Sequence, residues 1–229
     1  MRDKIIVLVS ILSFLALNSI AQKRYSPLSR MLWIKKKTHT ISLNSISLSA
    51  GYYNPSMSYF NNTFLPSEKA ADRFNGNILY GANLSINLPL NLGARVGAWY
   101  WAEKVSGQGS DAFNSLKVSL AGISLGAFYT YNNGFFGLKP YIGVDGSFLN
   151  IQDQYHANET VIKTSGSNFV WTPFVGINHE FNKNIVLGLE YGYFLGNYIQ
   201  DMKTVTSIVD ANVPVDGHKI QLTIGYKFQ

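Results

Sequence analysis

The fold is decided by a stretch near the end of the chain, His218-Lys219-Ile220-Gln221-Leu222-Thr223-Ile224-Gly225-Tyr226-Lys227-Phe228. Apolar or aromatic side chains alternate in it with polar residues and glycine. A period of two indicates a β-strand with one apolar and one polar face, and a helix with its period of 3.6 cannot produce it. The stretch therefore predicts a strand that lies between two different environments.

The same alternation occurs in seven earlier segments. They cover residues 46–52, 77–88, 92–100, 123–131, 142–148, 171–177 and 185–193. Together with the last stretch they predict eight strands. An even number allows both termini of the chain to lie on one side of a membrane, as in single-chain bacterial outer-membrane barrels.

The connections between these segments alternate between short and long. The short ones are rich in turn-forming residues and lie at Pro89-Leu90-Asn91, around Asn132-Asn133-Gly134, and at Asn182-Lys183-Asn184. The long ones cover residues 54–75, 106–115, 152–168 and 197–216. Short periplasmic turns and longer external loops are typical of outer-membrane barrels. We therefore predict an all-β, eight-stranded, antiparallel up-and-down transmembrane barrel.

The two faces of the predicted strands suit lipid outside and a filled polar interior. The second face combines glycines with charged side chains, which we expect in the lumen: Arg95, Glu103, Asp145, Glu180, Glu190 and Lys219. A buried charge without a partner is costly, so we expect Arg95 to pair with Glu190, Glu180 or Asp145 and to form a salt-bridged plug. A narrow channel is the competing interpretation, although eight strands leave an interior that side chains fill.

Aromatic residues mark both ends of the apolar face, as lipid-interface girdles require. The outer girdle is predicted at Tyr52, Tyr80, Tyr100, Phe148, Trp171 and Tyr193, and the periplasmic girdle at Tyr129, Tyr131, Phe181, Tyr226 and Phe228. Pro173 lies on the same face and cannot donate a ladder hydrogen bond. We expect a bulge there.

The N-terminus has the order of a secretory signal. Charged residues precede an apolar run from Ile5 to Leu17, and Ser19-Ile20-Ala21 supplies the small residues of a cleavage site. The run is shorter than the roughly 20 residues of a membrane-spanning helix. We predict a signal peptide over 1–21, a basic periplasmic arm over 22–38 and the barrel over 39–229.

Charge and composition narrow the possible functions. Only 14% of the residues are charged, against roughly 25% in ordinary soluble domains. The net charge of +6 is concentrated in the arm, since from His39 onward there are 11 basic and 12 acidic residues. A nucleic-acid-binding face on the barrel is therefore not predicted. The arm is either an amphipathic segment that contacts anionic lipid or an acidic partner, or a plain linker.

The residues predict neither a catalytic site nor a cofactor or metal site. The chain has no cysteine, and its histidines and carboxylates do not stand at ligand spacing. His218 is the one candidate for lipid A chemistry at the outer rim, but no spacing selects a partner for it among Ser207, Asp201, Asp210 and Asp216. We interpret His218 as an interfacial aromatic.

The alternating residues Ile220, Leu222, Ile224, Tyr226 and Phe228 resemble the final strand by which outer-membrane barrels are recognised for insertion. The layout of residues 40–229 is similar to the small barrels of the OmpA, OmpX and OmpW types, and especially to the PorT-like barrels common in Bacteroidota. This resemblance implies the outer membrane as location and the barrel-assembly machinery as a partner. It implies no shared activity.

These observations favour a non-enzymatic outer-membrane protein with a structural or interaction role in the cell envelope. Its expected partners are outer-membrane lipid, lipopolysaccharide and other envelope proteins that contact the external loops or the arm. A channel for small solutes is the first alternative, and a lipid A-modifying enzyme is the second.

Overall fold

The computed structural model describes residues 41–107, 113–132, 135–203 and 208–228, but not the side chains of Phe135 and of residues 200–211. All described residues belong to the unit His39–Gln229. The predicted signal peptide and arm lie outside the described residues, and so does Asn133-Gly134 in the second short turn.

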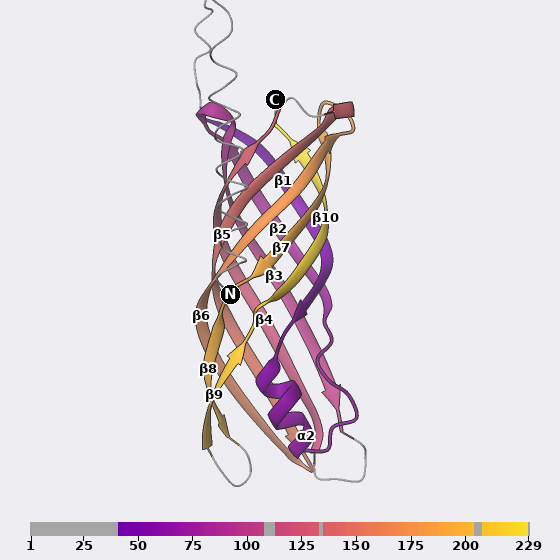
Figure 1. Ribbon diagram of the computed structural model, residues 1–229, viewed down its shortest axis with the longest axis vertical. Coiled ribbons are helices and arrows are strands. Elements are labelled where there is room, and N and C mark those ends of the chain that lie inside the picture. Colours follow the sequence, from indigo (N-terminus) through magenta and orange to yellow (C-terminus); the bar gives the residue numbers. More distant parts are fainter. Residues whose placement is uncertain (1–40, 108–112, 133–134, 204–207, 229) are drawn as a thin grey trace, which may run out of the picture. The chain divides into compact units, whose positions relative to one another are not determined.

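Eight antiparallel strands close into a barrel in the order β1-β10-β7-β6-β5-β4-β3-β2 (Figure 1). The strands are β1 (Ser42–Pro55), β2 (Asn77–Asn87), β3 (Leu92–Ser106), β4 (Phe113–Thr130), β5 (Leu138–Ala157), β6 (Thr160–Glu180), β7 (Ile185–Phe194) and β10 (Gly217–Lys227). The ring is closed by β1 and β10, which pair from Ser45 with Lys227 to Pro55 with Gly217. The predicted eight-stranded barrel is confirmed.

The two ends of the barrel differ. The turn end carries the short connections, two of which contain the 3-10 turns η3 (Pro89–Asn91) and η4 (Phe135–Gly137). The loop end carries the long connections, including a π-turn η2 (Phe60–Phe64), a single helical turn α2 (Leu65–Ser67) and the hairpin of β8 (Asn197–Lys203) and β9 (Ile208–Pro214). The barrel begins with β1 and finishes with β10, and the start of β1 and the end of β10 both lie at the turn end (Figure 1). No helix among the described residues is long and apolar enough to cross a membrane.

Two of the predicted loops are strands. Residues 152–168 belong almost entirely to β5 and β6, which pair up to Ala157 and Thr160 around a two-residue turn. Asn158 adopts a positive φ of 50° in this turn, a conformation that asparagine tolerates. The fourth long connection, residues 197–216, contains the β8–β9 hairpin. The prediction of a long loop over residues 152–168 was wrong because the alternation of residues 151–157 was not recognised as a continuation of the strand.

The bulge expected at Pro173 is not formed. Trp171 pairs with Leu195 and Phe174 pairs with Gly192, so the register between β6 and the neighbouring chain is the same on both sides of the proline. Against β5, the register also continues without a shift through Val144 and Pro173. The proline interrupts one ladder and leaves the alignment of the strands unchanged.

An apolar belt surrounds the outside of the barrel. It includes Leu48, Leu84, Val96, Leu125, Val144, Val175, Leu189 and Leu222, all exposed in the isolated chain. The predicted girdle residues Tyr52, Tyr80, Tyr100, Phe148, Trp171, Tyr129, Tyr131, Phe181 and Tyr226 are exposed on this outer surface, and Tyr193 and Phe228 are partly exposed. From Leu92 to Tyr100 the belt rises about 26 Å along β3, and about 20 Å across the membrane after tilting, somewhat less than the roughly 25 Å apolar band of outer-membrane barrels.

Beyond the belt, at the loop end, the apolar side chains change faces. In β5, Val144 and Phe148 point outward, whereas Leu149, Ile151 and Tyr155 are buried inside. The buried side chains join Met57, Phe60, Phe64, Leu65 and Phe74 of the first long connection in one hydrophobic cluster. The loop end is therefore built like a water-soluble protein, with a dry core and a polar outer surface.

Candidate functional site

Four charged side chains from four strands meet in the lumen. Arg95 of β3 contacts Asp145 of β5 through Nε and Nη2, at 2.9 and 2.5 Å. Its Nη1 donates to Glu190 of β7 at 2.5 Å, and Lys219 of β10 approaches the same carboxylate at 3.2 Å. Strand alternation turns all four side chains inward. We call these residues the ion cluster.

The polar groups of the ion cluster have further partners. The Tyr141 hydroxyl donates to Glu190 at 3.1 Å, and the amide of Gln221 donates to the other oxygen of that carboxylate at 2.9 Å. Arg95 also lies 3.8 Å above the ring of Phe174. Two cations and two anions balance each other here. A buried cluster is tolerated only when its charges are paired and its hydrogen bonds satisfied, and this one meets both conditions.

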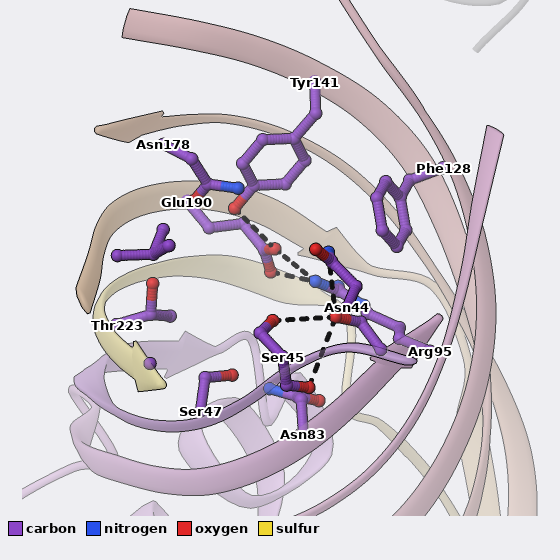
Figure 2. A pocket seen from close by; sticks show the side chains of 13 residues that line it. Asn44, Ser45, Ser47, Asn83, Arg95, Phe128, Tyr141, Asn178, Glu190 and Thr223 are labelled. Carbon is purple, nitrogen blue, oxygen red and sulfur yellow. Dashed lines mark hydrogen bonds and ion pairs between the residues drawn. The ribbon is translucent and has the colours of Figure 1, made fainter. Parts of the chain in front are cut away.

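A small polar cavity lies on the turn-end side of the ion cluster (Figure 2). Its volume is about 70 Å³, enough for a few water molecules. Figure 2 shows Arg95, Glu190 and Tyr141 converging at its wall, with Asn44 beside Arg95 and with Ser45 and Asn83 below them in the view. A second cavity of about 20 Å³ lies on the other side of Arg95, next to Trp99 and Lys219.

Apolar side chains fill the lumen between the ion cluster and the loop end. At the level next to the ion cluster, seven of the eight barrel strands each place an apolar side chain that is at most 2% exposed: Tyr53, Leu79, Trp101, Leu120, Leu149, Val170 and Phe194. The ring of Tyr53 packs 5.6 Å from that of Trp101 and 4.6 Å from that of Phe194. We call these seven residues the apolar plug. It separates the polar cavities from the loop end.

The sequence comparison identifies the family. Residues 33–228 match the family described as outer membrane protein beta-barrel domain. The chain belongs to this family. The predicted outer-membrane location and the expected resemblance to small outer-membrane barrels are thereby confirmed. No curated protein matches the chain.

Solved structures of other outer-membrane barrels share this fold. The outer membrane protein OprG from Pseudomonas aeruginosa superposes with a TM-score of 0.60 at 11% identity, over 83% of this chain and 98% of its own. A major outer membrane protein from Thermus thermophilus gives 0.52 at 14% identity, over 83% and 100%. At these identities the likeness concerns the fold alone.

Two of the six charges predicted for the lumen lie outside the ion cluster of this outer-membrane barrel. Glu180 is near the turn end and pairs with Lys139 and Lys227 at 2.6 and 2.5 Å, so the option of an Arg95–Glu180 pair was wrong. Glu103 lies near the loop end, where its carboxylate accepts hydrogen bonds from the backbone N–H groups of Asn75 and Gly76. It attaches the first long connection to β3.

His218 does not form the arrangement that lipid A chemistry would need. Its Nδ1 lies 2.6 Å from the Tyr191 hydroxyl, and its ring packs against Tyr193. Asp216 interacts instead with Tyr193 and Ser56. Ser207 and the side chains of Asp201 and Asp210 lie outside the described residues. Within the described part of the chain, no group of three or more His, Asp or Glu residues is placed to hold a metal ion.

The sequence interpretation missed two parts of the site. Tyr141 and Gln221 complete the ion cluster, but a single tyrosine or glutamine on a strand carries no signal of its partner. The apolar plug had a recognisable signal. Adjacent apolar residues such as Phe148 and Leu149 mark the point where the apolar face of a strand changes sides.

Proposed function

We propose that this protein is a closed outer-membrane barrel whose loop end faces outward and serves as an interaction surface in the cell envelope. The apolar plug carries this proposal. A pore requires a continuous aqueous path, whereas Trp101, Tyr53 and Phe194 occupy the lumen and are shielded from water. An eight-stranded interior has little spare width around them.

The framework of the loop end supports a presenting role. The Tyr155 hydroxyl donates to Glu68 at 2.9 Å and so links β5 to the segment after α2. The Tyr198 hydroxyl donates to Asp153 at 3.3 Å and links β8 to β5. Burial, followed by the charge of Asp153, raises the pKa of Tyr198 well above its usual value, so this donor keeps its proton. These bonds hold the loop end in one arrangement.

Planar-bilayer recording tests the closed state. We expect the wild-type chain to give no steady conductance, and a Trp101→Ala, Phe194→Ala double variant to give measurable openings because it removes two plug side chains. The variant also shows that inserted barrels can be detected. Steady, ion-selective current through the wild-type protein would disprove the closed state.

Cysteine labelling tests the orientation, since the chain has no cysteine of its own. Glu159→Cys places a thiol in the exposed turn between β5 and β6 at the loop end, and Lys183→Cys places one at the turn end. We expect a membrane-impermeant maleimide to label the first in intact cells and the second only after the outer membrane is opened. The reverse result would invert the proposed orientation.

The channel for small solutes remains the alternative function, and the polar cavity beside Arg95 is the observation in its favour. The same recordings decide between the two. The proposal also includes the assignment to PorT-like barrels and the expected roles of the arm, the insertion strand and envelope partners. These parts rest on the layout of the sequence. Deleting residues 22–38 and comparing the proteins captured from native outer membranes tests the arm.

A further inference from the structure

A row of lysines crosses the outer surface of the loop end. Lys104 of β3 pairs in register with Lys117 of β4, which pairs with Gln154 of β5, which pairs with Lys163 of β6. Neighbouring strands are about 4.8 Å apart, so the backbone positions of the three lysines lie within about 15 Å on one face. We call Lys104, Lys117 and Lys163 the lysine row.

Among the described side chains, the outward positions of β3 to β6 around the lysine row carry no carboxylate. The acidic residues next to it in sequence, Glu103 and Asp153, alternate to the other face, where they bind the first long connection and Tyr198. None of the three lysines forms an ion pair within the described residues. Lys104 and Lys117 lie directly opposite each other, an arrangement that destabilises a strand pair. An external anion would relieve this repulsion.

The surface between the lysine row and the membrane belt is polar and uncharged. The next paired positions towards the belt are Ala102, Ser119, Gln152 and Ser165, followed by Tyr100, Ala121, Asn150 and Ser167. The hydroxyl and amide groups of the serines, of Tyr100, of Asn150 and of Gln152 are suited to hydrogen bonds with sugars. Below them lie the apolar belt positions Ala98, Ile123, Phe148 and Phe169. One continuous surface therefore passes from apolar to hydroxylated to cationic.

We propose that this surface binds the phosphorylated sugar headgroup of lipopolysaccharide, with its acyl chains against the belt. Lys104 lies four residues beyond Tyr100, about 13 Å along the strand and about 10 Å above the interface after tilting. This is the height of a sugar headgroup attached to a lipid in the same leaflet. The order of lipid, sugar and phosphate in such a molecule matches the order of the three zones. The inference rests on the proposed outward orientation of the loop end.

The test titrates fluorescently labelled lipopolysaccharide onto the full chain refolded in uncharged detergent. Lysines near an anionic lipid surface contribute about five-fold each to affinity, so the triple variant Lys104→Gln, Lys117→Gln, Lys163→Gln should bind on the order of 100-fold more weakly. The triple Lys→Arg variant keeps the charge and should retain binding. Lys183→Gln, at the exposed turn end, is the matched control and should change nothing.

Two further probes distinguish the source of the anion. Chemically dephosphorylated lipopolysaccharide should bind the wild-type chain as weakly as the triple Gln variant binds the intact molecule. Lipid-free phosphorylated core oligosaccharide should bind more weakly than lipopolysaccharide, because it lacks the acyl chains that meet the belt. Raised salt should weaken wild-type binding more than that of the triple Gln variant.

The outcomes separate this inference from the proposed function. Unchanged affinity in the triple Gln variant, or equal binding of the lipid-free oligosaccharide, would overturn the headgroup site while leaving the closed barrel intact. Ion conductance by the wild-type chain would overturn the closed barrel without affecting the lysine dependence. Should the triple variant fail to refold, Lys163→Gln alone, which leaves the Lys104–Lys117 pair in place, should still lower the affinity about five-fold.

Discussion

The membrane part and the loop end of this barrel use the same strands with opposite faces. In the membrane part, Leu125 and Trp171 face lipid while Arg95 and Glu190 are buried in the lumen. At the loop end, Trp101 is buried in the lumen and the polar side chains face outward. The strand period is two in both regions, and only the phase of the apolar residues changes. The surrounding solvent therefore decides which face of a strand is apolar, and a strand that leaves the membrane has to invert.

The two tryptophans give the largest expected contrast. Trp101→Ala empties part of the apolar plug and should lower the free energy of unfolding by about 3–5 kcal/mol. Trp171 faces lipid and packs edge-on against Phe169 at 5.0 Å, so Trp171→Ala should cost only about 1 kcal/mol. Urea unfolding of the variants in lipid vesicles measures both. Equal costs would mean that the loop end is not a packed core.

Arg95→Ala tests the polar interior of the membrane part. Asp145 would lose its guanidinium, and Lys219 alone would remain for Glu190, so we expect a loss of about 3 kcal/mol from uncompensated buried charge. Lys139→Ala is the control, because its pair with Glu180 is partly exposed and should contribute at most about 1 kcal/mol. If both variants unfold at the same urea concentration, water reaches the ion cluster from the turn end and its charges are not buried.

The contrast between the membrane part and the loop end also explains which strands could be predicted from the sequence. The strands of the membrane part could be predicted because each has lipid on one face and a polar lumen on the other. This produces a long alternation of apolar and polar residues, to which Leu222 and Ile224 belong. The third long connection was misread because Leu149 and Ile151 continue the alternation in the opposite phase. A search for a single apolar face ends at Phe148, because beyond this residue the outer face of β5 meets water and the apolar side chains lie on the inner face.

The partners of charged residues were less predictable than the faces that carry them. Alternation placed Arg95, Asp145, Glu190 and Lys219 on the inner face, but strand register decides which of them meet. The alternation of β6 also turns Glu180 inward. Glu180 lies near the turn end, however, where it pairs with Lys227. Registers are fixed by turns and by the closure of the ring, and neither can be read from single segments.

A charge on the outer surface compares the two regions directly. Leu125 is 70% exposed in the belt, and Leu125→Arg should destabilise the barrel by about 2 kcal/mol or more because the guanidinium would enter lipid. Gln152→Arg adds the same side chain on the outer face of the loop end and should change stability by less than about 0.5 kcal/mol. Vesicle-based unfolding compares the pair. A tolerated Leu125→Arg would place the membrane boundary elsewhere.

The smallest expected effect concerns the bond between Tyr155 and Glu68. Tyr155→Phe removes a hydrogen bond to a carboxylate and should lower the free energy of unfolding by about 1 kcal/mol. The first long connection should also be cleaved faster by proteases, because Glu68 belongs to it. Burial, and then Glu68, raises the pKa of Tyr155 to about 12. Because this pKa lies above the ordinary value near 10 of the unfolded chain, the contribution is complete below pH 10 and is lost as the pH rises towards 12.

Absorbance titration of the phenolates isolates that group. The difference between wild type and Tyr155→Phe should show one phenol that ionises near pH 12, and the stability difference between the two proteins should shrink over the same interval. A difference curve centred near pH 10 would mean that water reaches Tyr155. The dry core would then end below this level, and the loop end above it would be an ordinary solvated hairpin rather than a continuation of the packed interior.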